Sequence, residues 1–189
     1  MAIKMEPNQI HPFNKRSFYI PDGKQDIGGG IELWQGIFQS VRPTLDRLIV
    51  NIDLSTGIMY KEGPLLNLCI DFFGRRPDTS PNTILTGKTL SEFQRNELQK
   101  FLSGVRVKVD TTGDKERVVR GLTKEGADRL TFETRPGVRI TVAQYFQTLN
   151  MPPRYPSVIC ALVRLLSPPT YMFKFLLCHR RLGRVPWYL

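Results

Sequence analysis

The stretch RVVRGLTKEGADRLTFETRPGVRITV, residues 117–142, decides the fold class of the second half of the chain. Three short runs rich in β-branched, aromatic and basic residues, 117–122, 129–133 and 137–142, are separated by segments of Gly, Asp, Thr and Pro. A similar run precedes them at 105–109. Several short runs bounded by turn residues are typical of strands in a small barrel or sandwich. The pattern therefore predicts a β-rich second half.

Two helices are expected around these strands. Residues 90–104, LSEFQRNELQKFLSG, place Phe and Leu at helical spacing. Ser91 and Gln94 have the spacing of a capping box, and Gly104 is a natural end to the helix. A shorter helix is expected after Thr141, where a hydroxyl residue precedes AQYFQT. The second half is thus predicted to combine short strands with short helices.

The first half predicts strands, turns and one helix. Strands are expected at residues 16–20, 31–43 and 47–60, with a glycine-rich turn between the first two. A turn at Ser55–Gly57 is expected to divide the last of these into a strand pair. Residues 63–74 place Leu, Cys and Phe at helical spacing after a proline, which predicts a short helix packed on the strands.

The chain is basic. Its formal net charge is +10 at pH 7 and its pI is about 9.8, which favours a polyanionic partner such as nucleic acid. Residues 161–189 hold five basic residues and no acid, so half of the excess lies there. Hydrophobic residues make up 41% of the chain, which is enough for a packed core.

The cysteines indicate the cellular compartment, and the length of the apolar segments indicates whether the chain crosses a membrane. The three cysteines, Cys69, Cys160 and Cys178, form no CxxC pair and no metal-ligand spacing. Such a sparse, odd set indicates reduced thiols in the cytosol or the nucleus. No uninterrupted apolar segment approaches the length of a membrane span, so no membrane partner is expected.

Catalytic chemistry is not expected in this chain. The two histidines, His11 and His179, lie in the two end segments, and nucleophilic catalysis usually needs a histidine beside the nucleophile. The carboxylates are scattered singly along the predicted strands and turns. The sequence therefore predicts no enzyme, no metal site, no cofactor and no small-molecule substrate.

Basic and aromatic residues are interleaved in the second half of the chain. Single-stranded nucleic acid is commonly held in this way, with cations on phosphates and aromatic rings on bases. Composition alone favours the plainer interpretation, in which the aromatic residues fill a core and the arginines lie on solvated strand faces.

Two segments resemble a known family. Residues 16–72 resemble the first linker domain of eukaryotic Argonaute proteins, and the specific pieces are GGGIELWQG, FQSVRP and NIDLSTGIMY. RVVRGLTKEGADRLTF (117–132) and ITVAQYFQTLNMPPRYP (140–156) resemble the PAZ domain that follows it in the same family, in the same order and at similar spacing. The amino-acid sequence of these segments is most similar to that of fungal members.

The resemblance implies an α+β fold, in which a small β-rich linker domain with one helix precedes a PAZ-type β-barrel. The barrel is of the OB or SH3-like kind, carries an inserted hairpin-helix unit, and is expected to be incomplete at its C-terminal end. The implied segments are an N-terminal extension (1–15), the linker 1 domain (16–75), a surface linker rich in Pro, Ser and Thr (76–89), the incomplete PAZ domain (90–160) and an atypical basic tail (161–189).

The resemblance also implies a function, namely binding of the single-stranded 3′ end of a small guide RNA in RNA silencing, or RNA interference. The family's stacking aromatic residue falls on Phe132, and its phosphate-binding helix tyrosine falls on Tyr145. Lys115 and Arg117 fall where cations neutralise phosphate charge, and Arg154 is a further RNA-binding candidate. Each assignment has a structural alternative, with the rings in the core and the cations on solvated faces.

The chain departs from the family pattern at several places. Asp110–Thr111 stand where many members have a histidine, and Leu149–Asn150 stand where many have a tyrosine. Arg117 replaces a tyrosine of the second strand, and residues 164–189 do not follow the closing strands of the barrel.

The N-terminal, MID and PIWI domains of the family are not found in this sequence. The chain is therefore expected to have no cleavage activity of its own, and to have the remaining Argonaute domains as partners if another chain supplies them. The alternative hypothesis is a truncated Argonaute remnant that binds no RNA and that either has only a structural role or folds poorly.

Overall fold

The computed structural model describes residues 10–76, 78–108, 116–134, 137–164 and 174–175. The described residues form two compact units, one ending at Lys61 and the other beginning at Glu62. The fold class is α+β, as the sequence predicts, with mostly antiparallel strands and few helices. Each unit is described by itself.

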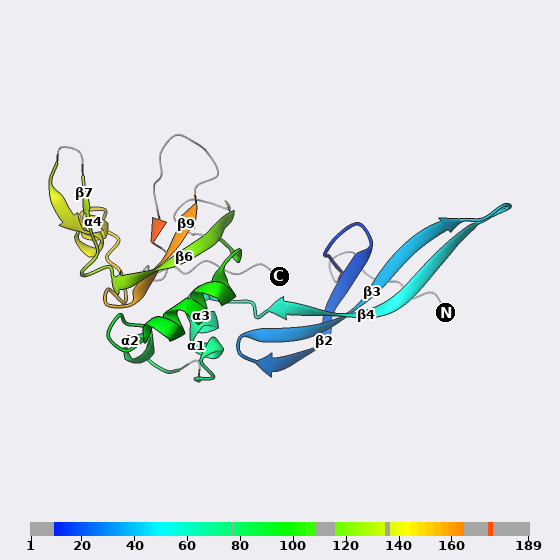
Figure 1. Ribbon diagram of the computed structural model, residues 1–189, viewed down its shortest axis with the longest axis horizontal. Coiled ribbons are helices and arrows are strands. Elements are labelled where there is room, and N and C mark those ends of the chain that lie inside the picture. The colour runs from blue at the N-terminus through cyan, green and yellow to red at the C-terminus, as the bar shows by residue number, and fades with distance from the viewer. Residues whose placement is uncertain (1–9, 77, 109–115, 135–136, 165–173, 176–189) are drawn as a thin grey trace. The chain divides into compact units, whose positions relative to one another are not determined.

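The first unit is a four-stranded antiparallel sheet in the order β1-β2-β3-β4. Its strands, blue to cyan in Figure 1, are β1 (His11–Pro12), β2 (Ser17–Gly28), β3 (Ile31–Pro43) and β4 (Leu48–Tyr60). β3 and β4 pair residue for residue, from Ile31 opposite Tyr60 to Pro43 opposite Leu48. This continuous pairing makes the β3–β4 hairpin the main element of the unit.

The predicted turn at Ser55–Gly57 is wrong, because these residues lie inside β4. Gly57 pairs with Trp34 of β3. A Cβ built on Gly57 would lie 2.6 Å from Cε1 of Tyr19, and the same ring also crowds Gly36. The glycines therefore make room for an aromatic ring that lies across the sheet, and the chain does not reverse there.

β2 is longer than the strand expected at residues 16–20. It runs to Gly28, and its pairing with β3 shifts register between Ile20 and Gln25, as at a bulge. The chain reverses only at Gly29–Gly30, where both glycines have positive φ. The expected glycine-rich turn is thus confined to two residues.

The part of the β3–β4 hairpin beyond Phe38, here called its distal half, carries exposed aliphatic side chains. β2 pairs with β3 only as far as Phe38, so beyond this point the described hairpin has two strands. Its exposed aliphatic residues are Val41, Leu48, Ile49, Val50 and Ile52. β4 is also an edge strand of the sheet.

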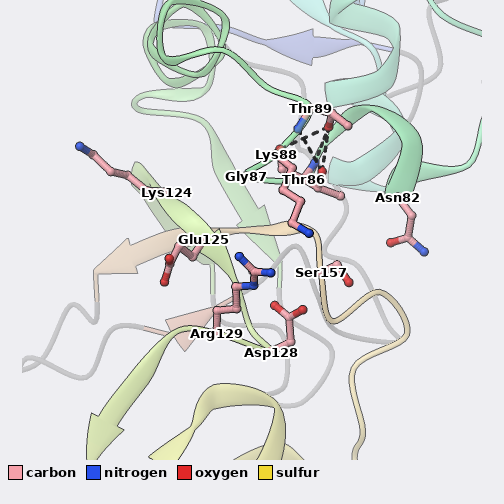
Figure 2. A pocket seen from close by; sticks show the side chains of 11 residues that line it. Asn82, Thr86, Gly87, Lys88, Thr89, Lys124, Glu125, Asp128, Arg129 and Ser157 are labelled. Carbon is pink, nitrogen blue, oxygen red and sulfur yellow. Dashed lines mark hydrogen bonds between the residues drawn. The ribbon is translucent and has the colours of Figure 1, made fainter.

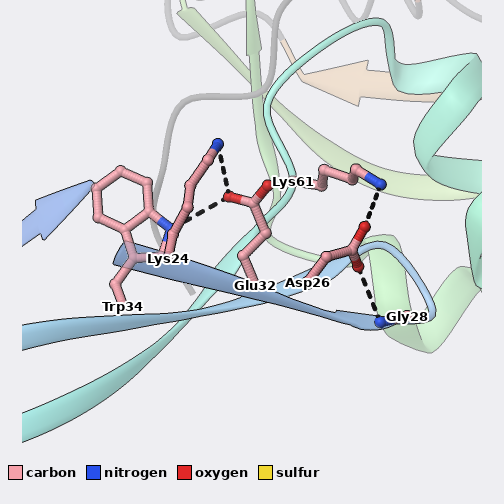
Figure 3. Close-up of polar contacts among 6 residues, drawn as sticks. All are labelled: Lys24, Asp26, Gly28, Glu32, Trp34 and Lys61. Atoms are coloured by element: carbon pink, nitrogen blue, oxygen red, sulfur yellow. Dashed lines mark hydrogen bonds and ion pairs between the residues drawn. The ribbon is translucent and has the colours of Figure 1, made fainter. Parts of the chain in front are cut away.

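A buried carboxylate organises the β2–β3 hairpin (Figure 3). The Glu32 side chain is only 6% exposed, and its Oε2 accepts a hydrogen bond of 3.2 Å from Nε1 of the fully buried Trp34. The same oxygen lies 3.1 Å from Nζ of Lys24. Buried carboxylates require such partners, because an uncompensated charge is costly in a low-dielectric interior.

A second carboxylate closes the end of this hairpin. Asp26 Oδ2 accepts a 2.6 Å hydrogen bond from Nζ of Lys61, and Asp26 Oδ1 accepts one of 2.9 Å from the backbone N–H of Gly28. The Lys61 ammonium, followed by the Gly28 N–H, lowers the pKa of the Asp26 carboxyl below its ordinary value. The pair links β2 to the residue that follows β4.

Asp26 is expected to make the first unit more stable at neutral pH than in acid. Its pKa is lowered in the folded state, so its contribution is fully present above the unfolded pKa and is lost as the pH falls through the folded pKa. Because the side chain is half exposed, the contribution is below about 1 kcal/mol. The measurement is urea unfolding of parent and Asp26→Asn chains in a Trp187→Phe background, where Trp34 is the sole tryptophan. The parent should be the more stable at neutral pH, and a difference that persists unchanged in strong acid would contradict this assignment.

The second unit contains three helices followed by a sheet with an inserted hairpin and helix (Figure 1). The helices are α1 (Leu65–Phe72), α2 (Pro81–Ile84) and α3 (Glu92–Leu102). The sheet has the order β10-β9-β6-β5, with β5 (Arg106–Lys108), β6 (Glu116–Gly126), β9 (Ile159–Arg164) and β10 (Lys174–Phe175). Between β6 and β9 come β7 (Thr131–Glu133), β8 (Arg139–Thr141) and α4 (Val142–Thr148). Within the described residues β5 and β10 are edges, so the sheet is not closed into a barrel.

The helices α1 and α3 are where the sequence predicts them. The capping box of α3 is present, since the Ser91 hydroxyl accepts from Gln94 N at 3.1 Å and Gln94 Oε1 accepts from Ser91 N at 3.0 Å. The helix α1 belongs to the second unit. There its Phe72 ring lies 4.7 Å from that of Phe101 in α3, measured between centroids.

The segment 76–89 is more than the surface linker that its composition predicts. It contains α2, and Leu85, the residue that follows this helix, is fully buried. The Leu85 carbonyl accepts from the N–H of Ile159 at 2.9 Å, and Thr86 forms a β-bridge with Val158. One apolar side chain and two backbone contacts therefore fix this segment against the start of β9.

Candidate nucleic-acid interface

The β7–β8 hairpin and α4 form an inserted unit, here called the insert (residues 131–148). Phe132 of β7 pairs with Ile140 of β8. The chain then enters α4 through a capping box, in which the Thr141 hydroxyl accepts from Gln144 N at 3.1 Å and Gln144 Oε1 accepts from Thr141 N at 2.9 Å. This cap fixes the start of a short helix that marginal propensity alone would not hold. The predicted helix after Thr141 is thereby confirmed.

The insert brings Phe132 and Tyr145 together. Their ring centroids are 5.3 Å apart with an interplanar angle of 81°, which is an edge-to-face contact. Both side chains are half-buried. Tyr145 also contacts the ring of Phe146, at 5.9 Å between centroids. The pair therefore keeps accessible aromatic surface while its packing fixes the ring orientations.

The insert is anchored to the rest of the unit by a small apolar core. Its buried residues are Ala127, Val142, Ala143 and Cys160, and the residues packed against them include Leu130, Phe132 and Phe146. Two backbone hydrogen bonds add to this core, from Val142 N to Leu130 O at 2.9 Å and from Ala143 N to Ala127 O at 2.8 Å. Phe132 is thus partly a core residue, as the structural alternative expects, and partly accessible.

Within the described residues, the structure does not bring the predicted cation Arg117 to the ring pair. Arg117 lies at the first end of β6, opposite Val107, and the nine residue steps to Gly126 span roughly 30 Å of strand. The Arg117 side chain is buried, and its Nε has no hydrogen-bond partner among the described residues. Lys115 lies outside the described residues.

Two exposed arginines lie elsewhere in this region. The Arg154 guanidinium lies 5.2 Å from the ring centroid of Tyr155, which is a cation–π contact. Arg139 is on the insert itself, where its Nε donates to the Thr131 hydroxyl at 3.1 Å. Sequence reasoning included Arg139 among the basic residues of the second half but did not select it, because its position opposite Glu133 and its contact with Thr131 depend on the strand register.

A polar pocket of about 480 Å³ lies beside the insert (Figure 2). Three separate segments line it, namely 82–89, the end of β6 with the turn after it (124–129), and Ser157. Sequence reasoning did not find this pocket, because it depends on how the three segments pack. The backbones approach so closely that a Cβ on Gly126 would lie 2.6 Å from the carbonyl oxygen of Pro156, and one on Gly87 would collide with the carbonyl oxygen of Lys124.

No group of three or more His, Cys, Asp and Glu side chains in the described part of the chain could hold a metal ion. None of the described helices has the length and apolar character needed to cross a membrane.

Comparisons with known proteins give the family of the chain. Residues 14–61 match the Argonaute linker 1 domain family. Protein argonaute 1D of Oryza sativa subsp. japonica is 36% identical over 141 residues, which cover 72% of this chain and 13% of that protein. Protein argonaute 1A of the same plant is 32% identical over 163 residues, which cover 83% of this chain and 14% of that protein. The crystal structure of Kluyveromyces polysporus Argonaute with a guide RNA superposes with a TM-score of 0.54 at 15% identity, covering 90% of this chain and 21% of that one, which shows a shared fold.

These matches include both units. The first unit ends at Lys61, so an alignment of 163 residues necessarily includes most of the second unit. The chain spans only 13–14% of the length of these curated relatives. On the matched linker 1 domain and the identity to plant Argonautes, the chain belongs to the Argonaute family.

Proposed function

We propose that the chain binds the single-stranded 3′ end of a small guide RNA in RNA silencing, through the insert that carries Phe132 and Tyr145. Residues of this chain supply no cleavage chemistry in this proposal, and the buried thiols Cys69 and Cys160 suit a cytosolic setting. The observation that carries the proposal is the half-buried edge-to-face pair of Phe132 and Tyr145 on an anchored insert.

The chemistry of the pair suits the end of an RNA strand. A base can stack on an accessible aromatic face, and a tyrosine hydroxyl can donate to a phosphate oxygen while its ring takes part in the contact. Because the two rings are fixed edge to face, little side-chain entropy is lost on binding. The Argonaute of matching fold from Kluyveromyces polysporus was solved with a guide RNA, which agrees with this proposal.

Removal of the Tyr145 ring is expected to weaken binding of single-stranded RNA about 5- to 150-fold, because a base–aromatic contact contributes roughly 1–3 kcal/mol. The measurement is fluorescence anisotropy of a labelled RNA with a free 3′ hydroxyl, compared with the same RNA blocked at that end. Tyr145→Ala should lower affinity for the free end and reduce the difference between the two RNAs. Tyr145→Phe should show a smaller loss, because it removes only the hydroxyl.

The matched control is Tyr155→Phe, which changes a tyrosine outside the insert and should leave binding unchanged. Equal affinity for free and blocked ends in the parent chain would contradict end recognition. Binding that is unaffected by Tyr145→Ala would show that attraction is only electrostatic. No binding at all would favour the alternative of a chain with a structural role.

A further inference from the structure

We propose that the pocket between segments 82–89 and 124–129 is a second RNA subsite, which binds one ribose–phosphate unit. Lys88 and Arg129 hold the phosphate, and Asp128 accepts from the ribose hydroxyls. The inference rests on the proposed function, since it assigns this pocket to the same strand whose end the insert binds. It differs from that function in its residues, its location and the part of the nucleotide it recognises.

Three charged side chains converge in this pocket. In Figure 2 the side chains of Lys88, Arg129 and Asp128 point toward one another across the pocket. Lys124 and Glu125 also line the pocket, but in Figure 2 both side chains point away from this group, and Nζ of Lys124 lies 3.4 Å from Oε1 of Glu92. Lys88 and Arg129 are therefore the cations placed to meet a ligand, while Lys124 belongs to the rim.

Backbone hydrogen bonds fix the positions of these three residues. The N–H of Asp128 donates to the Pro156 carbonyl at 3.1 Å, and the N–H of Arg129 donates to the Gly126 carbonyl at 3.1 Å. On the other wall, the hydroxyls of Thr86 and Thr89 lie 2.9 Å apart and enclose the turn that carries Lys88. The pocket is thus assembled from ordered backbone, with exposed side chains that are free to close on a ligand.

The mixture of charges selects the kind of ligand. Two cations suit a phosphate, and an arginine can bind it with two parallel hydrogen bonds. A carboxylate beside them would repel a bare phosphate, but it accepts hydrogen bonds from sugar hydroxyls, as acidic residues do in dinucleotide sites. A ribose–phosphate unit satisfies both demands, and its 2′ hydroxyl distinguishes RNA from DNA. A volume of about 480 Å³ is within the range of small-ligand sites.

The pocket is close to the insert along the chain. Arg129 precedes Phe132 by three residues, so at most roughly 10 Å of chain separates the two positions. Leu130, between them, packs against the core that anchors the insert. One RNA strand can therefore contact the ring pair with its end and this pocket with a nearby nucleotide.

The test compares pocket variants on RNA, on DNA of the same sequence and on uridine 5′-monophosphate. The variant Lys88→Ala/Arg129→Ala is expected to weaken RNA binding about fivefold or more, because it removes two charge-assisted contacts. Asp128→Asn should lower the preference for RNA over DNA, because the amide is a weaker acceptor for the 2′ hydroxyl, and it should raise DNA affinity slightly, because a negative charge near the phosphate is lost. Lys124→Ala, which removes a rim cation of the same charge, is the matched control and should have a smaller effect than the double variant.

The outcomes of the test distinguish binding of a free nucleotide from binding of an RNA strand. They also distinguish failure of the pocket proposal from failure of the end-binding function. Amide NMR shifts at residues 86–89 and 126–129 on addition of uridine 5′-monophosphate would support the pocket even if Tyr145→Ala leaves RNA binding unchanged, which would sink only the end-binding function. An effect of Tyr145→Ala with none from the pocket variants would overturn the pocket alone. An RNA preference untouched by Asp128→Asn, or a loss from Lys124→Ala as large as that from the double variant, would also overturn it. Because all three side chains are exposed, these variants are expected to fold.

Discussion

The Gly126→Ala variant is expected to lose about 2–3 kcal/mol of the free energy of unfolding of the second unit, and to lose RNA binding with it. A Cβ at this position would lie 2.6 Å from both the Pro156 and the Ser157 carbonyl oxygens, which are backbone atoms that cannot turn aside. The end of β6 would have to separate from the segment that leads into β9. Thermal or urea unfolding followed by far-UV circular dichroism measures the loss.

The loss of RNA binding follows from what this contact holds. Asp128 N donates to the Pro156 carbonyl, and the turn after Gly126 leads directly into the insert core through Ala127. Separation of the two segments would move the insert and the pocket together. Gly121→Ala is the matched control in the same strand, because its Cβ would be no closer than 3.4 Å to any atom and would meet only side chains. Equal stability of the two variants would show that the Gly126 contact relaxes without cost.

The Glu32→Ala variant is expected to lower the free energy of unfolding of the first unit by about 2–3 kcal/mol. The carboxylate that accepts from the Trp34 indole N–H at 3.2 Å would be removed, while the indole remains in a fully buried position. A buried donor that loses its acceptor costs more than the hydrogen bond contributes. Urea unfolding monitored by Trp34 fluorescence, in the Trp187→Phe background, measures the effect.

Two companion variants separate the parts of this network. Glu32→Gln keeps an oxygen acceptor for the indole, so it should cost about 1 kcal/mol. Lys24→Met leaves the Glu32 carboxylate, which is only 6% exposed, without this cation but keeps the indole hydrogen bond, so it should cost about 1–2 kcal/mol. If Lys24→Met were as harmful as Glu32→Ala, the ion pair and not the indole hydrogen bond would be the main contribution.

Features that depend on neighbours in the sequence could be predicted. The helix α3 follows from its apolar spacing, and its capping box is set by residues three apart. The helix α4 follows in the same way from Thr141. The family resemblance gave Phe132 and Tyr145 roles toward the same RNA end, but their ring contact was not predicted, because nothing in the local pattern states that β7 and α4 meet.

Features that depend on distant contacts could not be predicted. A Ser-Thr-Gly sequence indicates a turn, and only the ring of Tyr19, brought in by β2, shows that Gly57 belongs to a strand. The composition of 76–89 indicates a linker, but Leu85 finds a buried place beside Ile159. The pocket needs three such segments at once, so no short window of sequence contains it.

The exposed aliphatic side chains in the distal half of the β3–β4 hairpin affect whether the chain self-associates in solution. An edge strand with exposed Val and Ile can pair with another copy, and such surfaces are a source of self-association. The net charge of +10 opposes this, since like-charged chains repel one another. Salt screens that repulsion over about 8–10 Å at physiological strength, while the attraction between apolar surfaces persists. Ionic strength therefore controls colloidal stability. A high salt concentration chosen to suppress weak RNA binding also favours contact between these apolar edge strands of different copies.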